Sequence, residues 1–261
     1  MRRQPMGLPG GLIAAALLPA ALAAQGQSVT TIQDLMARLG AIRAATDFRA
    51  AGRLVRVDAS GDRRNYQLSL RARWFAGTVK IFCEVTDPPA ARVRLLLESP
   101  AAGPPSIRKG HAGARGPVAM PAESWGEPML ETGFTYEDLL ENQFQWRSQT
   151  LIGETRYGAR NCYRVRSVPG ADDQSQYATV ISWLDRESLF PVRVEKILRS
   201  TGTVKEFLYY GLRQVKGVWS ASQIEVKTRG QAGSSLLIVT RGAEKAHLRA
   251  EEFEPALLIR P

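Results

Sequence analysis

The sequence predicts a mainly β protein with a few helices, built on one broad antiparallel sheet that curls toward a barrel or half-barrel. Apolar and polar side chains alternate in residues 66–73, 79–85 and 92–95, and only short turns separate these runs. Because successive side chains of a strand point to opposite faces, each run builds one apolar and one charged face. The turns leave no room for a crossover helix, so neighbouring strands are antiparallel. The apolar face needs a cover, which helices or a lipid would supply.

The N-terminus has the features of a Sec-type signal peptide at residues 1–23. Arg2 and Arg3 precede an apolar stretch at residues 8–24, which ends in small residues before Gln25. The stretch is short for a membrane span, and no cysteine follows the expected cleavage point to accept a lipid. We therefore predict an exported, periplasmic protein in which residues 24–261 form one domain. A retained N-terminal anchor is the alternative.

The expected elements after the signal are an N-terminal helix, eleven strands and a second, short helix. Ser28 can cap the helix, in which Ile32, Leu35, Met36, Leu39 and Ile42 recur at helical spacing. Turn residues separate most of the strands, which predicts a single meander that curls because strands twist. The strands are expected at residues 48–58, 65–74, 78–86, 91–98, 145–157, 161–168, 176–185, 191–198, 204–211, 218–227 and 235–241.

A long segment without alternation separates the two groups of strands. Residues 99–132 are rich in proline and glycine, and a loop of this length inside a domain is usually functional or disordered. A short capped helix is expected next, at residues 135–141. Glu137 and Asp138 lie in its first turn, where negative charge complements the helix dipole.

Charge and cysteine content narrow the class of protein. The formal net charge is +10, and removal of Arg2 and Arg3 leaves about +8. The basic residues are scattered along the strands, which favours a solvated sheet face over a nucleic-acid site. Attraction to an anionic membrane surface and ordinary solubility both fit this charge. Cys83 and Cys162 alternate with apolar and with charged neighbours respectively, so we expect them on opposite faces, although a bulge can reset the phase and permit a disulfide.

No motif predicts an enzyme, a metal site or a cofactor. His111 and His247 stand in poorly patterned segments without metal-ligand spacing, and no Gly-x-Ser-x-Gly elbow is present. The protein is therefore expected to bind without chemistry of its own. Its candidate ligand-binding residues are those in the apolar phase of the strands, for which core packing is the alternative at any single position. These residues are Leu68, Leu70, Val79, Ile81, Val93, Leu95, Tyr163, Val165, Val192, Val194, Ile224 and Val226.

An ordered series in the second half resembles a known family. It comprises Phe-Thr-Tyr-Glu-Asp-Leu at residues 134–139, Tyr163, Trp-Leu-Asp-Arg-Glu-Ser-Leu-Phe-Pro-Val-Arg-Val-Glu at residues 183–195, and Gly-Val-Trp at residues 217–219. The series resembles the outer-membrane lipoprotein-sorting, LolA-like family. The resemblance implies an open half-barrel with helices covering the concave face, which holds lipoprotein acyl chains or another lipid for transport to the outer membrane.

The resemblance also sets expectations for partners. An inner-membrane donor and an outer-membrane acceptor would load and unload a monomeric carrier, and the family's gating arginine cannot be placed on any one residue of this chain. A lipid- or lipoprotein-sensing interaction module of the cell envelope is the alternative function. A charged residue at Leu70 or Leu95 is expected to weaken cargo binding, whereas Arg71→Ala, on the charged face, is expected to be nearly silent.

Overall fold

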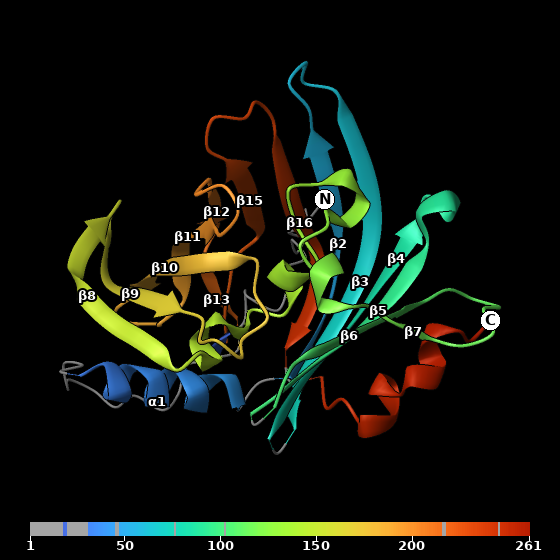
Figure 1. Ribbon diagram of the computed structural model, residues 1–261, viewed down its shortest axis with the longest axis horizontal. Coiled ribbons are helices and arrows are strands. Elements are labelled where there is room, and N and C mark those ends of the chain that lie inside the picture. Colours follow the sequence, from blue (N-terminus) through green and yellow to red (C-terminus); the bar gives the residue numbers. More distant parts are fainter. Residues whose placement is uncertain are drawn as a thin grey trace, which may run out of the picture.

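The computed structural model describes residues 18–19, 31–44, 47–75, 77–101, 103–215, 218–244 and 246–261. It contains a 13-stranded antiparallel sheet and a 3-stranded sheet (Figure 1). The predicted mainly β, antiparallel architecture is therefore confirmed. The predicted signal peptide lies outside the described residues except for β1 (Leu18–Pro19), which pairs with β14 (Val218–Ser220) in the small sheet together with β13 (Arg213–Val215).

Two sets of hairpins make up the large sheet. The first set is β2 (Asp47–Val57), β3 (Arg63–Phe75), β4 (Thr78–Asp87), β5 (Val93–Pro100), β6 (Ser106–Gly110) and β7 (Val118–Ala119). The second set is β8 (Ser148–Tyr157), β9 (Arg160–Val168), β10 (Tyr177–Asp185), β11 (Pro191–Leu198), β12 (Val204–Tyr210), β15 (Gln223–Thr228) and β16 (Ser234–Glu244). Within each set, strands that follow one another in the large sheet pair antiparallel, as the turn sequences predict.

The two sets join through their outermost members in the sequence. β16 pairs with β2, with Leu237 opposite Leu54, so the sheet order runs β7-β6-β5-β4-β3-β2-β16-β15-β12-β11-β10-β9-β8. The prediction of one meander in chain order was wrong at this point, because turn sequences determine only the pairing of neighbouring strands. The sheet stays open, with β7 and β8 at its edges.

The chain must pass from one edge of this sheet to the other between β7 and β8. We call residues 120–147 the crossing segment, which runs in front of the curved sheet (Figure 1). It is built of the short 3-10 helices η3 (Ala122–Ser124), η4 (Met129–Glu131), η5 (Glu137–Leu139) and η6 (Asn142–Gln145). The helix expected at residues 135–141 is thus a 3-10 turn of three residues, η5, and Glu141 with a φ of 47° ends the helical path.

The N-terminal helix α1 (Ile32–Ala44) begins after Thr31, whose hydroxyl accepts a hydrogen bond from the Asp34 N–H at 3.1 Å. Ser28, the expected cap, lies outside the described residues. Leu35, Leu39 and Ile42 form the buried face of α1 as the spacing predicts. The helix lies along one end of the sheet, near β3 and β8 (Figure 1). The helical cover expected over the concave face is therefore not confirmed, since α1 lies at an end and the crossing segment has only short 3-10 turns.

The two faces of the sheet carry separate apolar clusters. We call the face that turns toward the crossing segment the inner face. It holds the larger cluster, which we call the main cluster and which includes Leu70, Ile81 and Phe207. On the opposite, outer face, Phe82 and Leu96 are buried beneath Leu248, Phe253 and Leu258. These last residues belong to the C-terminal segment 246–261, which contains η7 (Ala250–Phe253) and η8 (Pro255–Leu258). Part of the outer face is therefore a second core and not a solvated surface.

The cysteines follow the predicted separation. Cys83 is buried in the main cluster on the inner face, and Cys162 is buried in a small cluster with Trp183 and Val192. Both are free thiols. Because neighbouring Tyr163 lies in the main cluster, Cys162 points to the other face. Burial raises the pKa of the Cys83 thiol to about 12, so it stays protonated and unreactive at neutral pH.

Arg71 holds the C-terminal segment against the outer face. Its guanidinium lies 4.0 Å from the ring centroid of Phe82 and donates a hydrogen bond from Nε to the Glu252 carbonyl at 2.8 Å. Arg71 is therefore not simply solvated, because the C-terminal segment covers this part of the charged face. That Arg71→Ala is nearly silent for cargo binding stays a prediction, whereas its effect on stability is expected to be measurable.

Arg71→Ala is expected to lower the free energy of unfolding by about 1.5 to 3 kcal/mol, the usual contribution of a hydrogen bond to a charged group. Urea unfolding followed by circular dichroism measures this loss. Arg166→Ala, on an exposed position of β9, is the matched control and should change stability by less than about 0.5 kcal/mol. Equal effects of the two variants would show that Arg71 does not anchor the segment.

Candidate binding site on the inner face

The inner face gathers most of the predicted lining residues. All twelve except Val93 and Val192 are buried members of the main cluster, and Val93 packs partly buried against it. Val192 instead lies with Cys162 and Trp183. The reason is a bulge: Leu184 is opposite Pro191 and Trp183 is opposite Arg193, which leaves Val192 without a partner in the ladder. The strict two-residue period therefore misplaced Val192.

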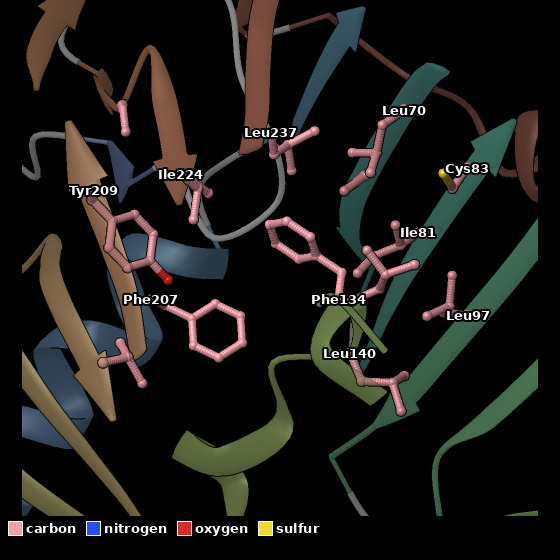
Figure 2. Packing of buried hydrophobic residues seen from close by; sticks show 14 of the residues in the cluster. Leu70, Ile81, Cys83, Leu97, Phe134, Leu140, Phe207, Tyr209, Ile224 and Leu237 are labelled. Carbon is pink, nitrogen blue, oxygen red and sulfur yellow. The ribbon is translucent and has the colours of Figure 1, made fainter. Parts of the chain in front are cut away.

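Side chains of the crossing segment fill the space in front of this face. Those buried in the main cluster are Met120, Trp125, Met129, Phe134, Leu139, Leu140 and Trp146. Figure 2 shows Phe134 and Leu140 between Phe207 on one side and Ile81 on the other. The Phe134 and Phe207 rings meet edge to face with centroids 6.0 Å apart. The crossing segment thus occupies the position that a ligand of the inner face would need.

A close backbone approach fixes the middle of the crossing segment. The N–H of Gly133 donates a hydrogen bond to the Ser235 hydroxyl of β16 at 2.7 Å. A Cβ atom at residue 133 would lie 3.2 Å from Cγ1 of Val226 and 3.7 Å from Cβ of Ser235. Glycine therefore allows the segment to lie closely against β15 and β16.

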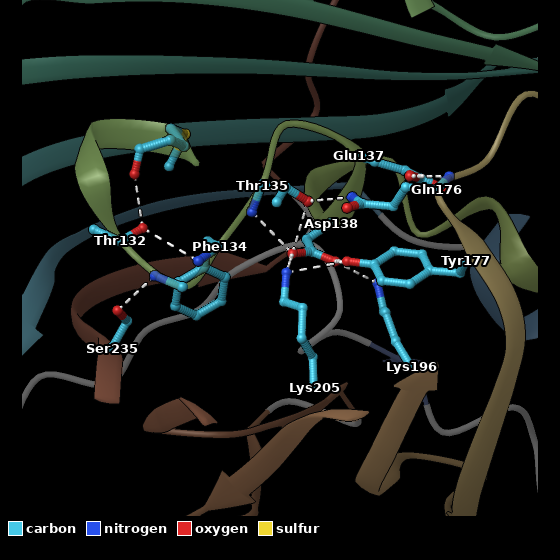
Figure 3. A network of polar contacts seen from close by, with 12 residues as sticks. Thr132, Phe134, Thr135, Glu137, Asp138, Gln176, Tyr177, Lys196, Lys205 and Ser235 are labelled. Carbon is cyan, nitrogen blue, oxygen red and sulfur yellow. Dashed lines mark hydrogen bonds and ion pairs between the residues drawn. The ribbon is translucent and has the colours of Figure 1, made fainter. Parts of the chain in front are cut away.

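Asp138 lies at the centre of a buried polar network (Figure 3). Its Oδ1 accepts hydrogen bonds from Lys196 Nζ at 2.9 Å and from the Tyr177 hydroxyl at 2.7 Å. Its Oδ2 accepts from Lys205 Nζ at 2.7 Å, and from both the N–H and the hydroxyl of Thr135 at 2.9 Å. The carboxylate is thus fully satisfied, although the Asp138 side chain is only 1% exposed and each lysine side chain 6%.

The network shifts the titration of its members. Burial alone would raise the pKa of Asp138, but the charges of Lys196 and Lys205 and hydrogen bonds from Lys205 and Tyr177 outweigh it, so this pKa lies well below its usual range. Burial lowers the pKa of Lys205, with Asp138 opposing the shift. Burial and the Asp138 charge raise the pKa of Tyr177 well above its ordinary value. At neutral pH the site therefore holds an aspartate carboxylate and a neutral tyrosine.

Two further contacts hold the crossing segment beside this network. The Glu137 carboxylate accepts hydrogen bonds from the Ser175 hydroxyl and, at 3.0 Å, from the Gln176 N–H. Glu141 pairs with Arg43 of α1 at 3.4 Å. Burial raises the pKa of Glu137 and of Glu141, which hydrogen bonds and the Arg43 charge respectively oppose. The segment is therefore anchored through three acidic side chains, Glu137, Asp138 and Glu141, each with its own partners.

A small cavity remains between the crossing segment and the sheet, with a volume of about 30 Å³. A single water needs about 10 to 15 Å³, and pockets for small organic ligands measure about 300 to 1,000 Å³. The cavity therefore has no room for an acyl chain while the segment is in place. Its lining consists of Leu70, Phe134, Asp138, Leu139, Glu141, Lys196, Phe207, Tyr209, Ile224 and Leu237.

The contacts of Glu137 and Asp138 were not predicted from the sequence. Both residues were expected in the first turn of a helix as charges that complement its dipole, whereas both are buried and bind residues of the sheet and its loops. A signal was available in the strands. Lys196 follows Val194 at a spacing of two, and Lys205 precedes Phe207 at the same spacing, so both lysines stand in the apolar phase. A buried lysine requires an acidic partner.

Neither histidine belongs to this site. His111 and His247 are both exposed. Within the ranges that the structure describes, no group of three His, Cys, Asp or Glu side chains could hold a metal ion. No helix among the same residues is long and apolar enough to cross a bilayer.

The C-terminal part of the chain matches a family model. A family model described as "-like: Uncharacterized protein" matches residues 114–260, which is more than half of the chain. No curated protein matches the sequence.

Solved structures share the fold at low sequence identity. An outer membrane lipoprotein-sorting protein domain from Vibrio parahaemolyticus is 17% identical, with a TM-score of 0.76 over 85% of this chain and 96% of its own. A DUF1329 family protein from Desulfovibrio piger is 14% identical, with a TM-score of 0.77 over 86% and 96% of the two chains. A LolA superfamily protein from Nitrosomonas europaea is 14% identical, with a TM-score of 0.67 over 88% and 100%. The chain therefore belongs to the family that the matching model describes, and its fold is that of the LolA-like, lipoprotein-sorting group of structures.

Proposed function

We propose that this protein is a periplasmic binding protein that holds lipoprotein acyl chains or another lipid against its inner face, for transport to the outer membrane. The observation that carries the proposal is the nature of the cover. A broad apolar face, to which both sets of strands contribute, is covered by a segment of short 3-10 turns anchored through buried ion pairs. The LolA-like fold supports the same function, and signal-directed export would place the protein in the periplasm.

The energetics of displacement depend on the ligand. Separating Asp138 from Lys196 and Lys205 is unfavourable while the ammonium groups stay buried and unpaired, so the ligand must offset this cost. An acyl chain that replaced the apolar side chains of the crossing segment would recover about 0.8 kcal/mol for each buried CH₂ group. The predicted lining residues, Leu70 and Ile224 among them, would then contact the acyl chain in place of Phe134 and Leu139. Such binding needs no catalytic group.

The proposal predicts that a covalent cross-link between the crossing segment and β16 abolishes lipid uptake. Cysteines at Gly133 and Ser235 suit a disulfide, because the 3.7 Å between their Cβ positions lies within the usual range of about 3.5 to 4.5 Å, and Gly133 has no positive φ. In a background with Cys83 and Cys162 replaced by alanine, the oxidised double variant is expected to lose at least tenfold in the uptake of a dansylated diacyl lipopeptide. Reduction should restore uptake.

The single variants Gly133→Cys and Ser235→Cys are the matched controls and should bind in either redox state. Uptake by the oxidised double variant at the rate of the reduced one would refute displacement of the segment. Absence of uptake by the unmutated protein would refute the carrier function itself. A charge at Leu70 or Leu95 tests binding less cleanly, because both are buried in the main cluster and the substitution also affects folding.

A further inference from the structure

The charges that meet at the inner face are divided between the sheet and its cover. Lys196 of β11 and Lys205 of β12 come from the sheet, and Asp138 comes from the crossing segment. Glu141, also of the crossing segment, pairs with Arg43 of α1. In each of these pairs the cation stays with the body of the protein and the anion belongs to the part that covers it. Displacement of the segment would therefore leave cationic groups without their carboxylates.

The sheet alone supplies a nearly complete set of donors for one anion. Three of the groups that bind Asp138 belong to adjacent strands of the sheet: Lys196 Nζ, Lys205 Nζ and the Tyr177 hydroxyl. Together they donate hydrogen bonds to both carboxylate oxygens. Lys205 Nζ also donates to the Tyr177 hydroxyl at 3.1 Å. Both ammonium groups lie 4.7 to 5.6 Å from the ring centroids of Tyr177 and Phe207. Since the rings and the strands position these donors, the site does not depend on the crossing segment for its shape.

The requirement for an anion follows from the cost of unpaired charge. A neutral ligand that displaced Asp138 would leave two ammonium groups under an apolar cover without a counter-charge, which is strongly unfavourable. A ligand with its own carboxylate would restore the hydrogen bonds to Lys196, Lys205 and Tyr177. The cavity shows where the rest of such a ligand would lie, because it joins Asp138 and Lys196 to apolar walls that include Leu70 and Leu237.

We propose that Lys196, Lys205 and Tyr177 form a head-group site for a long-chain carboxylate, and that Asp138 occupies this site in the absence of ligand. The crossing segment thus acts as an internal competitor that carries the same functional group as the ligand. This inference rests on the proposed function and makes it more specific, because of the two ligand classes it selects a lipid with a free carboxylate over the ester- or amide-linked acyl chains of a lipoprotein.

The test compares ligands that share a twelve-carbon chain. Isothermal titration calorimetry with the full mature chain at pH 8, below the critical micelle concentration, gives the dissociation constants of laurate, dodecanol and dodecyl phosphate. We expect laurate to bind at least tenfold more tightly than dodecanol and more tightly than dodecyl phosphate. Equal binding of laurate and dodecanol would overturn the head-group site while leaving the proposed function intact. Binding of neither laurate nor dodecanol would overturn the head-group site, whereas the uptake of the dansylated diacyl lipopeptide tests the proposed function separately. Tighter binding of dodecyl phosphate would overturn the assignment of a carboxylate.

Variants test whether Lys196 and Lys205 cause the preference for laurate over dodecanol. Asp138→Asn removes the competing carboxylate and is expected to raise the affinity for laurate more than that for dodecanol. Asp138→Asn combined with Lys196→Met and Lys205→Met should bring the two affinities to within about threefold. Lys227→Met is the control, because this lysine is on β15, is 47% exposed and pairs with Glu225. Loss of the preference in Lys227→Met to the same extent would show a general effect of charge and overturn the site. The ratio measured in the unmutated protein stands as a test even if a variant does not fold.

Discussion

Asp138→Asn is expected to lower the free energy of unfolding by about 3 to 5 kcal/mol, the usual cost of removing one partner from a buried ion pair. The amide has nearly the shape of the carboxylate but cannot neutralise Lys196 and Lys205, which are buried with it. Urea unfolding at pH 7 measures the loss, and Asp172→Asn, at an exposed position, is the control and should be nearly silent. A loss below about 1 kcal/mol would show that the lysines find other partners or water.

The pH dependence of this difference identifies its origin. Because the pKa of Asp138 is lower in the folded protein than in the unfolded chain, its contribution to stability is complete above the unfolded value of about 4 and declines as the pH falls toward the folded value. The gap between the unmutated protein and Asp138→Asn should therefore be constant near neutral pH and narrow below about pH 4. A gap that stays constant in acid would exclude the carboxylate charge as its source.

An apolar replacement of the three charged side chains of the network separates the effect of charge from that of shape. Asp138→Leu together with Lys196→Met and Lys205→Met leaves no unpaired charge, and such replacements are often neutral or stabilising by about 1 to 4 kcal/mol. We expect this variant to be more stable than Asp138→Asn. If it is as unstable as Asp138→Asn, the cost lies in packing and not in the unpaired ammonium groups.

Phe134→Ala is the second large effect, with an expected loss of about 3 to 5 kcal/mol in the free energy of unfolding. Phe134 is 4% exposed and packs edge to face on Phe207 in the main cluster. Because Phe134 also lines the cavity, its removal enlarges the space next to Leu70 and Leu237. The variant should therefore bind an apolar dye such as 1-anilinonaphthalene-8-sulfonate under conditions where the unmutated protein does not.

Phe134→Leu is the matched control for this prediction. It keeps an apolar side chain at the same position and should lose less than about half as much stability. Dye binding by Phe134→Ala with no loss of stability would show that the crossing segment contributes little to the fold. Loss of stability without dye binding would show that the surrounding side chains close the space.

The strands could be predicted from the sequence, but the pairing that joins the two sets of strands could not. Alternation located the apolar phase of residues such as Leu70 and Val165, and short turns identified the hairpins. The pairing of β16 with β2 joins residues far apart in the sequence, and no local pattern encodes such a pairing. The bulge that excludes Val192 from the main cluster also could not be predicted from a fixed two-residue period.

The candidate site was predictable only in its apolar half. Lys196 and Lys205 stand in the apolar phase, but a long side chain can extend from such a position to solvent, so the phase alone does not establish a buried charge. The acidic partner lies in a segment whose 3-10 turns lack a helical or strand period. The burial of Asp138 depends on how the crossing segment packs against the sheet, which no local pattern of the sequence predicts.

The pairing of β16 with β2 has a consequence for how the chain acquires its structure. The strands from β2 to β7 can form hairpins as soon as they are made, yet the free edge of β2 stays exposed until β16, near the end of the chain, is available. An exposed strand edge is a site of aggregation, and pairing between distant segments is slow. The unpaired edge of β2 is therefore the part of the sheet at which a chain that lacks β16 is expected to aggregate.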